Sequence, residues 1–433
     1  MSGLAELLLA QGCRVSGSDL HEGPALSRLR ALGASVFVGH RAEQIEGAEA
    51  VVVSSAIQPD NPELMAARSA AIPVLHRSTL LGELIRYRPS IAVAGTHGKT
   101  TTTALIATIL KKGGLDPTVY AGARLGDEPS SVRSGRGPVV VLEVDESDRS
   151  LLSLRPIHAV VTNIELDHTD CYRDQEEVEK TFEGFLRQLP FYGRTFACND
   201  DPGARAVIKK VHQRVITYGL SGGVDYSAVN IRFGSFSVAY ELKSAAETLG
   251  EVRLPLGGRH NLLNSLAAAA VGHTLGIAFE KIKAGLEGFR APQRRLEHKG
   301  ERKGVLVLDD YAHHPTEVTA TLGACRATGR PVRLVFQPHR YSRTRRFMDD
   351  FARSFEGAGK VYLVDIYSAG EKPIPGVSSR ELRQRVEQQT PCEYFQDPVR
   401  LVDRLVEESR PGEILITMGA GDVWKVGEMF LER

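Results

Sequence analysis

Short apolar runs alternate with segments of helical spacing along most of this chain. At its start we expect a helix over 2–11, a strand over 14–18, a helix over 25–32, and strands over 35–38 and 50–54. Strands that alternate with helices in this way form parallel sheets covered by helices. The predicted fold class is therefore α/β, and the first domain is of the Rossmann type.

The same alternation restarts twice further along the chain. The segment 86–90 resembles a linker, and the run 292–295 marks a second boundary. Between them, residues 225–241 alternate polar and apolar positions, as antiparallel strands do. The pattern near the C-terminus predicts strands over 304–308, 332–336, 360–364 and 413–417, and helices over 315–325 and 345–355. We expect three domains, at 1–88, 89–292 and 293–433, the last again Rossmann-like.

Composition narrows the classes of protein. A formal net charge of +1 gives no overall attraction to nucleic acid or to an anionic membrane. The five cysteines are scattered without a Cys-x-x-Cys pair, which suits a reducing cytoplasm and argues against a disulfide framework or a zinc site. No apolar run approaches the roughly 18 residues of a membrane span. Glu6 interrupts the first apolar stretch, so a signal peptide is not expected.

A glycine-rich loop follows the apolar run 91–94. It reads Gly95, Thr96, His97, Gly98, Lys99, Thr100 and Thr101. Glycines let backbone N–H groups turn toward a phosphate, the following helix offers a partly positive N-terminus, and Lys99 adds a charge. Thr100 is placed to give its hydroxyl to a nucleotide-bound Mg²⁺. Val93 stands where the standard P-loop has its first glycine, so an ordinary strand–turn–helix junction is the alternative. We favour phosphate binding by this loop.

Two acidic clusters follow apolar strands predicted over 138–144 and 158–162. Glu143 precedes Asp-Glu-Ser-Asp, and the second strand leads to Asn163-Ile164-Glu165-Leu166-Asp167-His168. The carboxyl ends of parallel strands meet at one edge of a sheet, so these clusters and the phosphate loop form one predicted site. Carboxylate oxygens suit Mg²⁺, and a neutral imidazole from His168 can join them. A loop or helix-capping histidine is the alternative.

Further polar positions each allow two interpretations. Asp19 follows the first predicted strand and is either the acid that meets a ribose hydroxyl or a turn carboxylate. Ser55 and His76 follow strand-like runs and are either ligand-binding or ordinary loop residues. Asn261, in the Gly-Gly-Arg-His-Asn stretch before an alanine-rich helix, either reads an adenine edge or caps the helix.

Two loops of the third domain combine acidic, histidine and arginine side chains. The first spans 309–315, with the sequence Asp-Asp-Tyr-Ala-His-His-Pro, and the second spans 337–343, with Gln-Pro-His-Arg-Tyr-Ser-Arg. The arginines of the second loop follow a buried strand. This position favours an anion site over a solvated basic helix start.

Together these stretches resemble the Mur ligase family, the ATP-dependent amide-forming enzymes of bacterial peptidoglycan synthesis. The resemblance is carried by Gly-Thr-His-Gly-Lys-Thr-Thr-Thr at 95–102, by both acidic clusters, and by the loops at 309–315 and 336–344. It covers the chain from Met1 to about Asp422. The last two loops look like those of members that add L-alanine to UDP-N-acetylmuramate. The resemblance implies a UDP-sugar domain, a central ATPase domain and an amino-acid domain, with a cytoplasmic location and no nucleic-acid partner or membrane insertion.

The resemblance also implies roles for individual residues. Lys99 would contact the β- and γ-phosphates. Thr100 and Glu143 would bind one Mg²⁺, and Glu143 and His168 would bind a second. The expected catalytic residues are therefore Lys99, Glu143 and His168. The remaining expected contacts are Asn261 to adenine, Arg295 to the phosphates, Asp310 to the ATP ribose, His313, Arg340 and Arg343 to the amino acid and acyl phosphate, and Asp19, Ser55 and His76 to the UDP-sugar.

The chain departs from the family pattern at three places. The family's N-terminal glycine-rich loop ends in Met-Ser-Gly, which is where this sequence starts. We therefore expect the natural chain to begin some 15–20 residues earlier, with one strand of about 5–6 residues and its turn, so that the first domain lacks its first strand here. Arg149 stands where relatives often carry glycine. Lys180 is the lysine nearest the position that some relatives carbamylate, and we assign it no role.

The expected chemistry follows from the groups present. A carboxylate is a poor electrophile, so ATP must convert it to an acyl phosphate before an amine attacks, and cations must neutralise the charge that develops. The competing hypotheses are a ligase that attaches a whole peptide to the same sugar, a P-loop NTPase or kinase without an amino-acid substrate, and a binding protein that has lost the UDP-sugar cradle. The sequence leaves the oligomeric state open.

Overall fold

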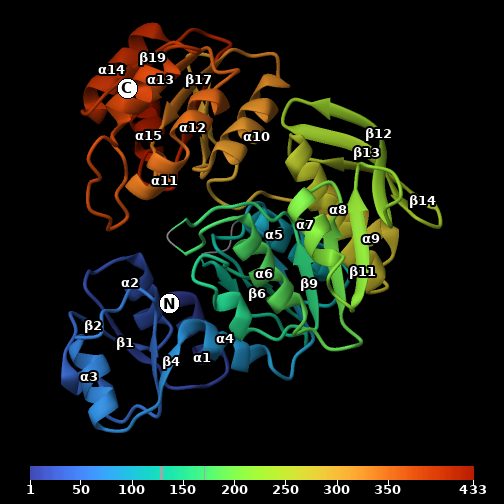
Figure 1. Ribbon diagram of the computed structural model, residues 1–433, viewed down its shortest axis with the longest axis vertical. Coiled ribbons are helices and arrows are strands. Elements are labelled where there is room, and N and C mark those ends of the chain that lie inside the picture. The colour runs from blue at the N-terminus through green and yellow to red at the C-terminus, as the bar shows by residue number, and fades with distance from the viewer. Residues whose placement is uncertain (127–129, 170) are drawn as a thin grey trace.

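Three α/β domains follow one another along the chain in the computed structural model, which describes residues 1–126, 130–169 and 171–433 (Figure 1). The first domain lies beside the central one, and the C-terminal domain lies across the carboxyl ends of the central strands. The boundaries expected at 88/89 and 292/293 stay predictions.

The first domain carries two separate pairs of parallel strands. β1 (Ser16–Asp19) pairs with β2 (Ser35–Val38), and β3 (Val51–Val53) pairs with β4 (Val74–His76). The helices are α1 (Ser2–Ala10), α2 (Pro24–Ala31), α3 (Pro62–Ser69) and α4 (Arg77–Ile85). The predicted helices and strands up to residue 54 are confirmed within two residues. The expectation of a preceding strand stays a prediction.

A ten-stranded sheet forms the central domain, in the order β14-β13-β12-β11-β10-β9-β5-β8-β6-β7. β5 (Ser90–Ala94) lies between β9 (His158–Val161) and β8 (Val140–Glu143) and is parallel to both. The antiparallel pair predicted over 225–241 is confirmed as β12 (Tyr226–Gly234) and β13 (Ser237–Ser244). The remaining strands are β6 (Thr118–Tyr120), β7 (Val132–Arg133), β10 (Arg194–Cys198), β11 (Arg214–Gly219) and β14 (Thr248–Leu254).

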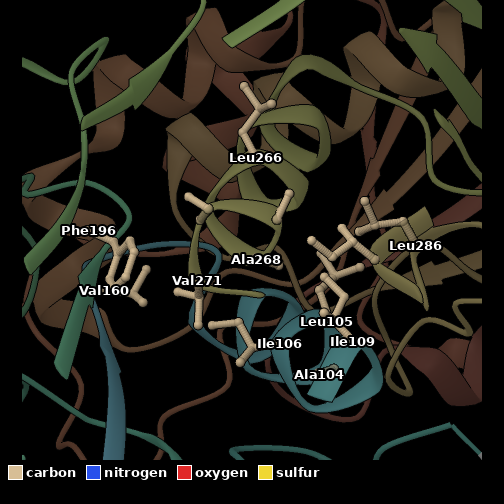
Figure 2. Close-up of a cluster of buried hydrophobic side chains, with 14 of the residues drawn as sticks. Ala104, Leu105, Ile106, Ile109, Val160, Phe196, Leu266, Ala268, Val271 and Leu286 are labelled. Atoms are coloured by element: carbon tan, nitrogen blue, oxygen red, sulfur yellow. The ribbon is translucent and has the colours of Figure 1, made fainter. Parts of the chain in front are cut away.

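The central core is built by α5 (Lys99–Lys112), α8 (Arg259–Thr274) and α9 (Phe279–Glu287) packed on this sheet (Figure 2). Small residues let these helices approach closely. A Cβ at Gly285 would lie 3.0 Å from the Cα of Ile109. α5 begins at Lys99, directly after Gly98, which takes the left-handed conformation (φ 81°). The other central helices are α6 (Gln175–Leu186) and α7 (Pro202–Ile208).

The C-terminal domain has a six-stranded sheet in the order β15-β16-β20-β17-β18-β19. Its strands are β15 (Glu297–Arg302), β16 (Val305–Asp310), β17 (Val332–Phe336), β18 (Lys360–Leu363), β19 (Cys392–Tyr394) and β20 (Ile414–Met418). Its helices are α10 (Pro315–Arg326), α11 (Tyr341–Arg346), α12 (Met348–Ser354), α13 (Ser379–Val386), α14 (Pro398–Glu408) and α15 (Trp424–Glu432). In the described part of the chain, no helix is long and apolar enough to cross a bilayer.

The single helix predicted over 345–355 is wrong. The chain forms α11 and α12 instead, broken at Phe347, whose φ of −110° and ψ of 22° lie outside the helical range. The Phe347 ring packs edge-on against the His314 ring, with 4.7 Å between centroids. This contact holds the break against the start of α10, which a helical period along the sequence does not reveal.

Candidate active site

A cavity of about 290 Å³ lies where the phosphate loop, the start of α8 and the start of α10 meet. Its walls include six of the residues that the sequence assigned to nucleotide binding: His97, Gly98, Thr101, Asn261, Arg295 and Asp310. They come from the central and C-terminal domains, so the two domains build one pocket.

The phosphate loop requires glycine at both of its glycine positions. Gly98 has a φ of 81°, and a Cβ there would lie 2.6 Å from Oδ1 of Asn264. Gly95 has a φ of 138°, and its Cβ would lie 2.0 Å from Oγ1 of Thr162. A side chain at either position would therefore strain the backbone and force a neighbouring group to move. A close approach of this kind is what a backbone cradle for phosphate needs.

Lys99 is held inside this loop. Its Nζ donates to the carbonyl oxygens of Gly95 (2.6 Å) and Thr96 (3.0 Å) and to Oε2 of Glu146 (2.8 Å). Burial opposes the charged amine, but the carboxylates of Glu146, Asp145 and Glu143 raise the pKa of Lys99 above its ordinary value. The lysine is therefore a fixed positive charge at physiological pH.

Thr100 and Glu143 lie together, as the family resemblance implied. The Thr100 hydroxyl donates to Oε1 of Glu143 at 3.0 Å, and Oε2 of Glu143 accepts from the Gly122 N–H at 2.6 Å. A hydroxyl oxygen and a carboxylate oxygen 3.0 Å apart are hard donors of the kind that Mg²⁺ prefers. These residues fit a magnesium ion.

His168 lies with Glu146 and Asp167. Its Nε2 is 3.4 Å from Oε1 of Glu146 and 3.7 Å from Oδ2 of Asp167. Burial opposes the imidazolium, while Glu146 and Asp167 raise the pKa of His168. Ligand atoms of Asp145, Glu146 and His168 lie within 4.8 Å of one another, a set that also fits a divalent cation. Sequence reasoning did not single out Glu146. Its signal was its place in the acidic run after β8.

The C-terminal domain reaches the phosphate loop through α10. His97 Nδ1 lies 3.0 Å from Oε1 of Glu317, and His97 Nε2 lies 3.2 Å from Oε2 of Glu165. Burial works against the charged ring, but Glu317 and Glu165 raise the pKa of His97 to about 10. Sequence reasoning missed Glu317. Its available signal was the capping box that it forms with His314 at the start of α10.

Asp310 lies at the end of β16, buried against the cavity. Its carboxylate accepts from the N–H groups of Leu296 (2.7 Å) and Ala312 (2.8 Å). Burial raises the pKa of Asp310 to about 6, although Arg295 and both N–H groups act in the opposite direction. The Arg295 guanidinium lies 5.3 Å from the centroid of the Tyr311 ring. Asn261 donates to the Gly257 carbonyl at 2.8 Å.

The residues expected near the amino acid cluster around His339. The His313 and His339 rings lie 5.5 Å apart, and Nη1 of Arg343 lies 3.1 Å from Nδ1 of His339. Burial lowers the pKa of His313 to about 3, which keeps its imidazole neutral. Arg343 also pairs with Asp167 of the central domain at 3.0 Å. Arg340 lies 3.9 Å from the Glu371 carboxylate.

The residues expected at the UDP-sugar belong to the first domain. Asp19 accepts from the His21 N–H at 3.2 Å, as a turn carboxylate does, and Ser55 is exposed after β3. The His76 side chain caps α4 by accepting from the Ser78 N–H. The next residue, Arg77, lies 3.3 Å from Asp148 and so connects this domain to the acidic loop of the central one.

Arg149 joins the two acidic loops. Its backbone is left-handed (φ 57°), the conformation that glycine adopts most easily. Its guanidinium donates to the Cys171 carbonyl (2.9 Å) and to Glu177 (2.5 Å) and lies 5.2 Å from the centroid of the Tyr172 ring. Lys180 pairs with Glu176 on the exposed surface of α6.

These features define the class of protein: a three-domain α/β protein with a phosphate loop, carboxylate-rich cation positions and a pocket completed by a neighbouring domain. Three family models match it in order, "Mur ligase family, catalytic domain" over residues 1–89, "Mur ligase middle domain" over 93–272 and "Mur ligase, glutamate ligase domain" over 294–421. The chain belongs to the Mur ligase family.

Among curated relatives, the UDP-N-acetylmuramate–L-alanine ligase of Geobacter sp. (strain M21) is 47% identical, over 100% of this chain and 95% of the relative. The ligase of the same name from Solibacter usitatus is 46% identical, over 100% and 93%. The crystal structure of UDP-N-acetylmuramate-alanine ligase MurC from Thermotoga maritima superposes with a TM-score of 0.83 at 26% identity, covering 100% of this chain and 96% of the other.

A murein peptide ligase from Psychrobacter arcticus shares the fold, with a TM-score of 0.71 at 22% identity and coverage of 100% and 96%. The MurF ligase of Thermotoga maritima, solved in complex with ADP, shares it with a TM-score of 0.68 at 18% identity and coverage of 89% and 95%. At these identities the likeness concerns the fold alone.

Proposed function

We propose that this protein is an ADP-forming ligase that joins L-alanine to the carboxylate of UDP-N-acetylmuramate through an acyl phosphate, in peptidoglycan precursor synthesis. The observation that carries the proposal is the convergence of the phosphate loop, the acidic cluster and Arg343 at one domain junction, through the Lys99–Glu146 and Asp167–Arg343 contacts. Relatives of that name at 45–47% identity over the whole chain support the choice of substrates.

Binding of ATP is the task proposed for the cavity and the loop beside it. Gly95 and Gly98 bring backbone close to the phosphates, and Lys99 places a positive charge among them. Asn261 and Asp310 line the cavity and would contact the adenine and the ribose, and Arg295, also in its wall, would supply a guanidinium to the phosphates. Because these groups come from two domains, closure of the C-terminal domain completes the pocket and excludes water that would hydrolyse an acyl phosphate.

Magnesium is the proposed metal. Thr100 and Glu143 would hold one ion. The second ion, which the family resemblance puts between Glu143 and His168, would be held by His168 with Glu146 and Asp145, whose ligand atoms lie within 4.8 Å of one another. A bound Mg²⁺ supplies charge neutralisation for the transferring phosphoryl group. The fixed positive charge of Lys99 also neutralises phosphoryl charge. Its hydrogen bond to Glu146 orients that carboxylate toward His168.

The acceptor side is assigned to the C-terminal domain. Neutral His313 can accept a hydrogen bond from an incoming ammonium or amine, and Arg340 and Arg343 supply cations for the amino-acid carboxylate and for the oxyanion that forms on attack. Asp19, Ser55 and His76 remain the proposed UDP-sugar contacts. The use of ATP and the five free cysteines support a cytoplasmic location.

The test is an assay of ADP and phosphate release with ATP, Mg²⁺, UDP-N-acetylmuramate and L-alanine, omitting each in turn. We expect release only when all four are present, and a product that carries alanine. A parallel assay replaces L-alanine by the tripeptide L-alanyl-γ-D-glutamyl-meso-diaminopimelate. Preference for the tripeptide would assign the peptide-attaching activity, and equal ADP release without any amino acid would contradict the ligase assignment.

A further inference from the structure

His314 has a buried ring nitrogen without a partner. Its side chain caps α10 by accepting from the Thr316 N–H through Nδ1 at 3.4 Å, and the residue is only 2% exposed. Its Nε2 has no hydrogen-bond partner within the described residues. Buried polar atoms of this kind are rare in folded proteins and call for an explanation, such as an ion or ligand that belongs there.

Two further metal-ligating side chains face His314. The His97 ring lies 4.8 Å from the His314 ring between centroids, and the Glu165 carboxylate lies 3.2 Å from Nε2 of His97. One ligand atom from each of the three residues lies within 4.8 Å of the others. Two imidazoles and one carboxylate are a donor set for borderline cations such as Zn²⁺, with one tetrahedral position left open.

The surroundings of these side chains also match a metal site. His97 holds Glu317 through its other ring nitrogen at 3.0 Å, and Glu165 accepts from the Thr316 hydroxyl at 2.8 Å. Metal-bound histidines and carboxylates are usually oriented by such outer hydrogen bonds. Coordination through Nε2 of His97 releases the proton that this nitrogen shares with Glu165, because a metal-bound imidazole is neutral. Coordination through Nε2 of His314 moves its proton to Nδ1 and gives up only the long 3.4 Å contact with Thr316.

We propose that His97, Glu165 and His314 form a binding site for a divalent transition cation such as Zn²⁺, distinct from the oxygen-rich positions around Glu143. The ligands come from the phosphate loop, the loop after β9 and the start of α10. A bound ion therefore links the central domain to the C-terminal domain beside the nucleotide cavity. The site does not depend on the identity of the amino acid or of the sugar nucleotide.

Co²⁺ absorption spectroscopy tests the proposal, because four-coordinate Co²⁺ has intense visible bands. The metal-free protein (residues 1–433) is titrated with Co²⁺ in excess Mg²⁺ without nucleotide, and Zn²⁺ is then added to displace the Co²⁺. The variants are His314→Gln and Glu165→Gln. The second keeps an oxygen for Thr316 and leaves the helix cap intact. The exposed His298→Gln is the matched control, and Glu146→Gln reports on the other acidic cluster.

We expect the wild type, His298→Gln and Glu146→Gln to show the four-coordinate spectrum. In His314→Gln and Glu165→Gln the spectrum should be lost or the Co²⁺ affinity lowered at least 10-fold, with unchanged circular dichroism. Three results would overturn the site: no four-coordinate spectrum in the wild type, loss in Glu146→Gln alone, or wild-type binding by both His314→Gln and Glu165→Gln. Because no substrate is present, these results leave the ligase assignment untouched.

Discussion

Arg343 of the C-terminal domain and Asp167 of the central domain form a two-point ion pair across the domain junction, with Nε–Oδ1 and Nη2–Oδ2 distances of 3.0 and 3.1 Å. Both side chains are about 95% buried. Burial opposes ionisation of the carboxyl, but the guanidinium holds the pKa of Asp167 well below its usual range. The pair therefore fixes the position of the C-terminal domain over the acidic cluster.

Removal of one partner should destabilise this junction. Arg343→Met leaves a buried carboxylate without its cation, which costs about 3–5 kcal/mol for a buried pair. The double variant Arg343→Met/Asp167→Asn should recover part of that loss, because no unpaired charge remains. Calorimetric unfolding measures both. Arg345→Met, at an exposed position of the same helix, is the control. A double variant no more stable than Arg343→Met would contradict the pairing.

Glu143 should be essential for turnover but not for folding. Glu143→Ala should lower kcat by at least the roughly 10²-fold that follows the loss of one electrostatic stabiliser, because the carboxylate holds Thr100 and supplies a proposed metal ligand. Turnover as a function of Mg²⁺ concentration measures this effect. Glu176→Ala, on the exposed surface of α6, is the control. A near-normal rate for Glu143→Ala at low Mg²⁺ would refute the assignment.

Alanine substitutions at Gly98 and Gly114 distinguish the cost of backbone strain from the effect of phosphate-loop geometry on ATP binding. Both have φ near +80°, but a Cβ at Gly98 would strike Asn264, whereas nothing lies within 4 Å of a Cβ at Gly114. Gly114→Ala should cost only the roughly 1–2 kcal/mol of a left-handed non-glycine residue. Gly98→Ala should in addition weaken ATP binding at least 10-fold, measured by calorimetric titration. Equal ATP affinity in the two variants would show that the loop does not bind phosphate.

Asp310 predicts a specific pH dependence of stability. Its folded-state pKa of about 6 lies above the ordinary value of 3.8. The stability that the protonated Asp310 side chain contributes to the fold is therefore complete below about pH 3.8 and is lost as the pH rises through 6. Asp310→Asn is neutral throughout and should gain stability relative to the wild type between pH 4 and 6, by about 3 kcal/mol for a shift of this size.

Melting temperatures of the wild type and Asp310→Asn across this pH range measure the effect. If the asparagine amide changes stability by an amount that does not depend on pH, it shifts the difference in melting temperature equally at every pH and leaves its pH dependence unchanged. Asp349→Asn, at an exposed position, is the control. A difference curve that stays flat from pH 4 to 8 would show that Asp310 ionises normally in the folded protein.

Local patterns in the sequence determined most of the elements and the phosphate loop. The strands predicted over 35–38 and 332–336 match the structure residue for residue, because strand periodicity is a property of neighbouring positions. The meeting of the phosphate loop with the acidic cluster at Glu143 also followed from the sequence, since both come directly after strands that a parallel sheet places side by side. The particular pair of Thr100 and Glu143 was implied by the family resemblance.

The tertiary structure decided which polar groups meet across the domains. Asp167 and Arg343 are 176 positions apart, and His97 and Glu317 are 220 positions apart. No periodicity relates such positions, and only the packing of the C-terminal domain on the central sheet brings them together. Two contacts within single domains are also tertiary: Phe347 packs on His314 in the C-terminal domain, and Glu146 pairs with Lys99 in the central domain. The sequence by itself specified elements and candidate groups because those depend on local backbone preferences, whereas the partners of the buried charges depend on contacts that form only when the domains pack.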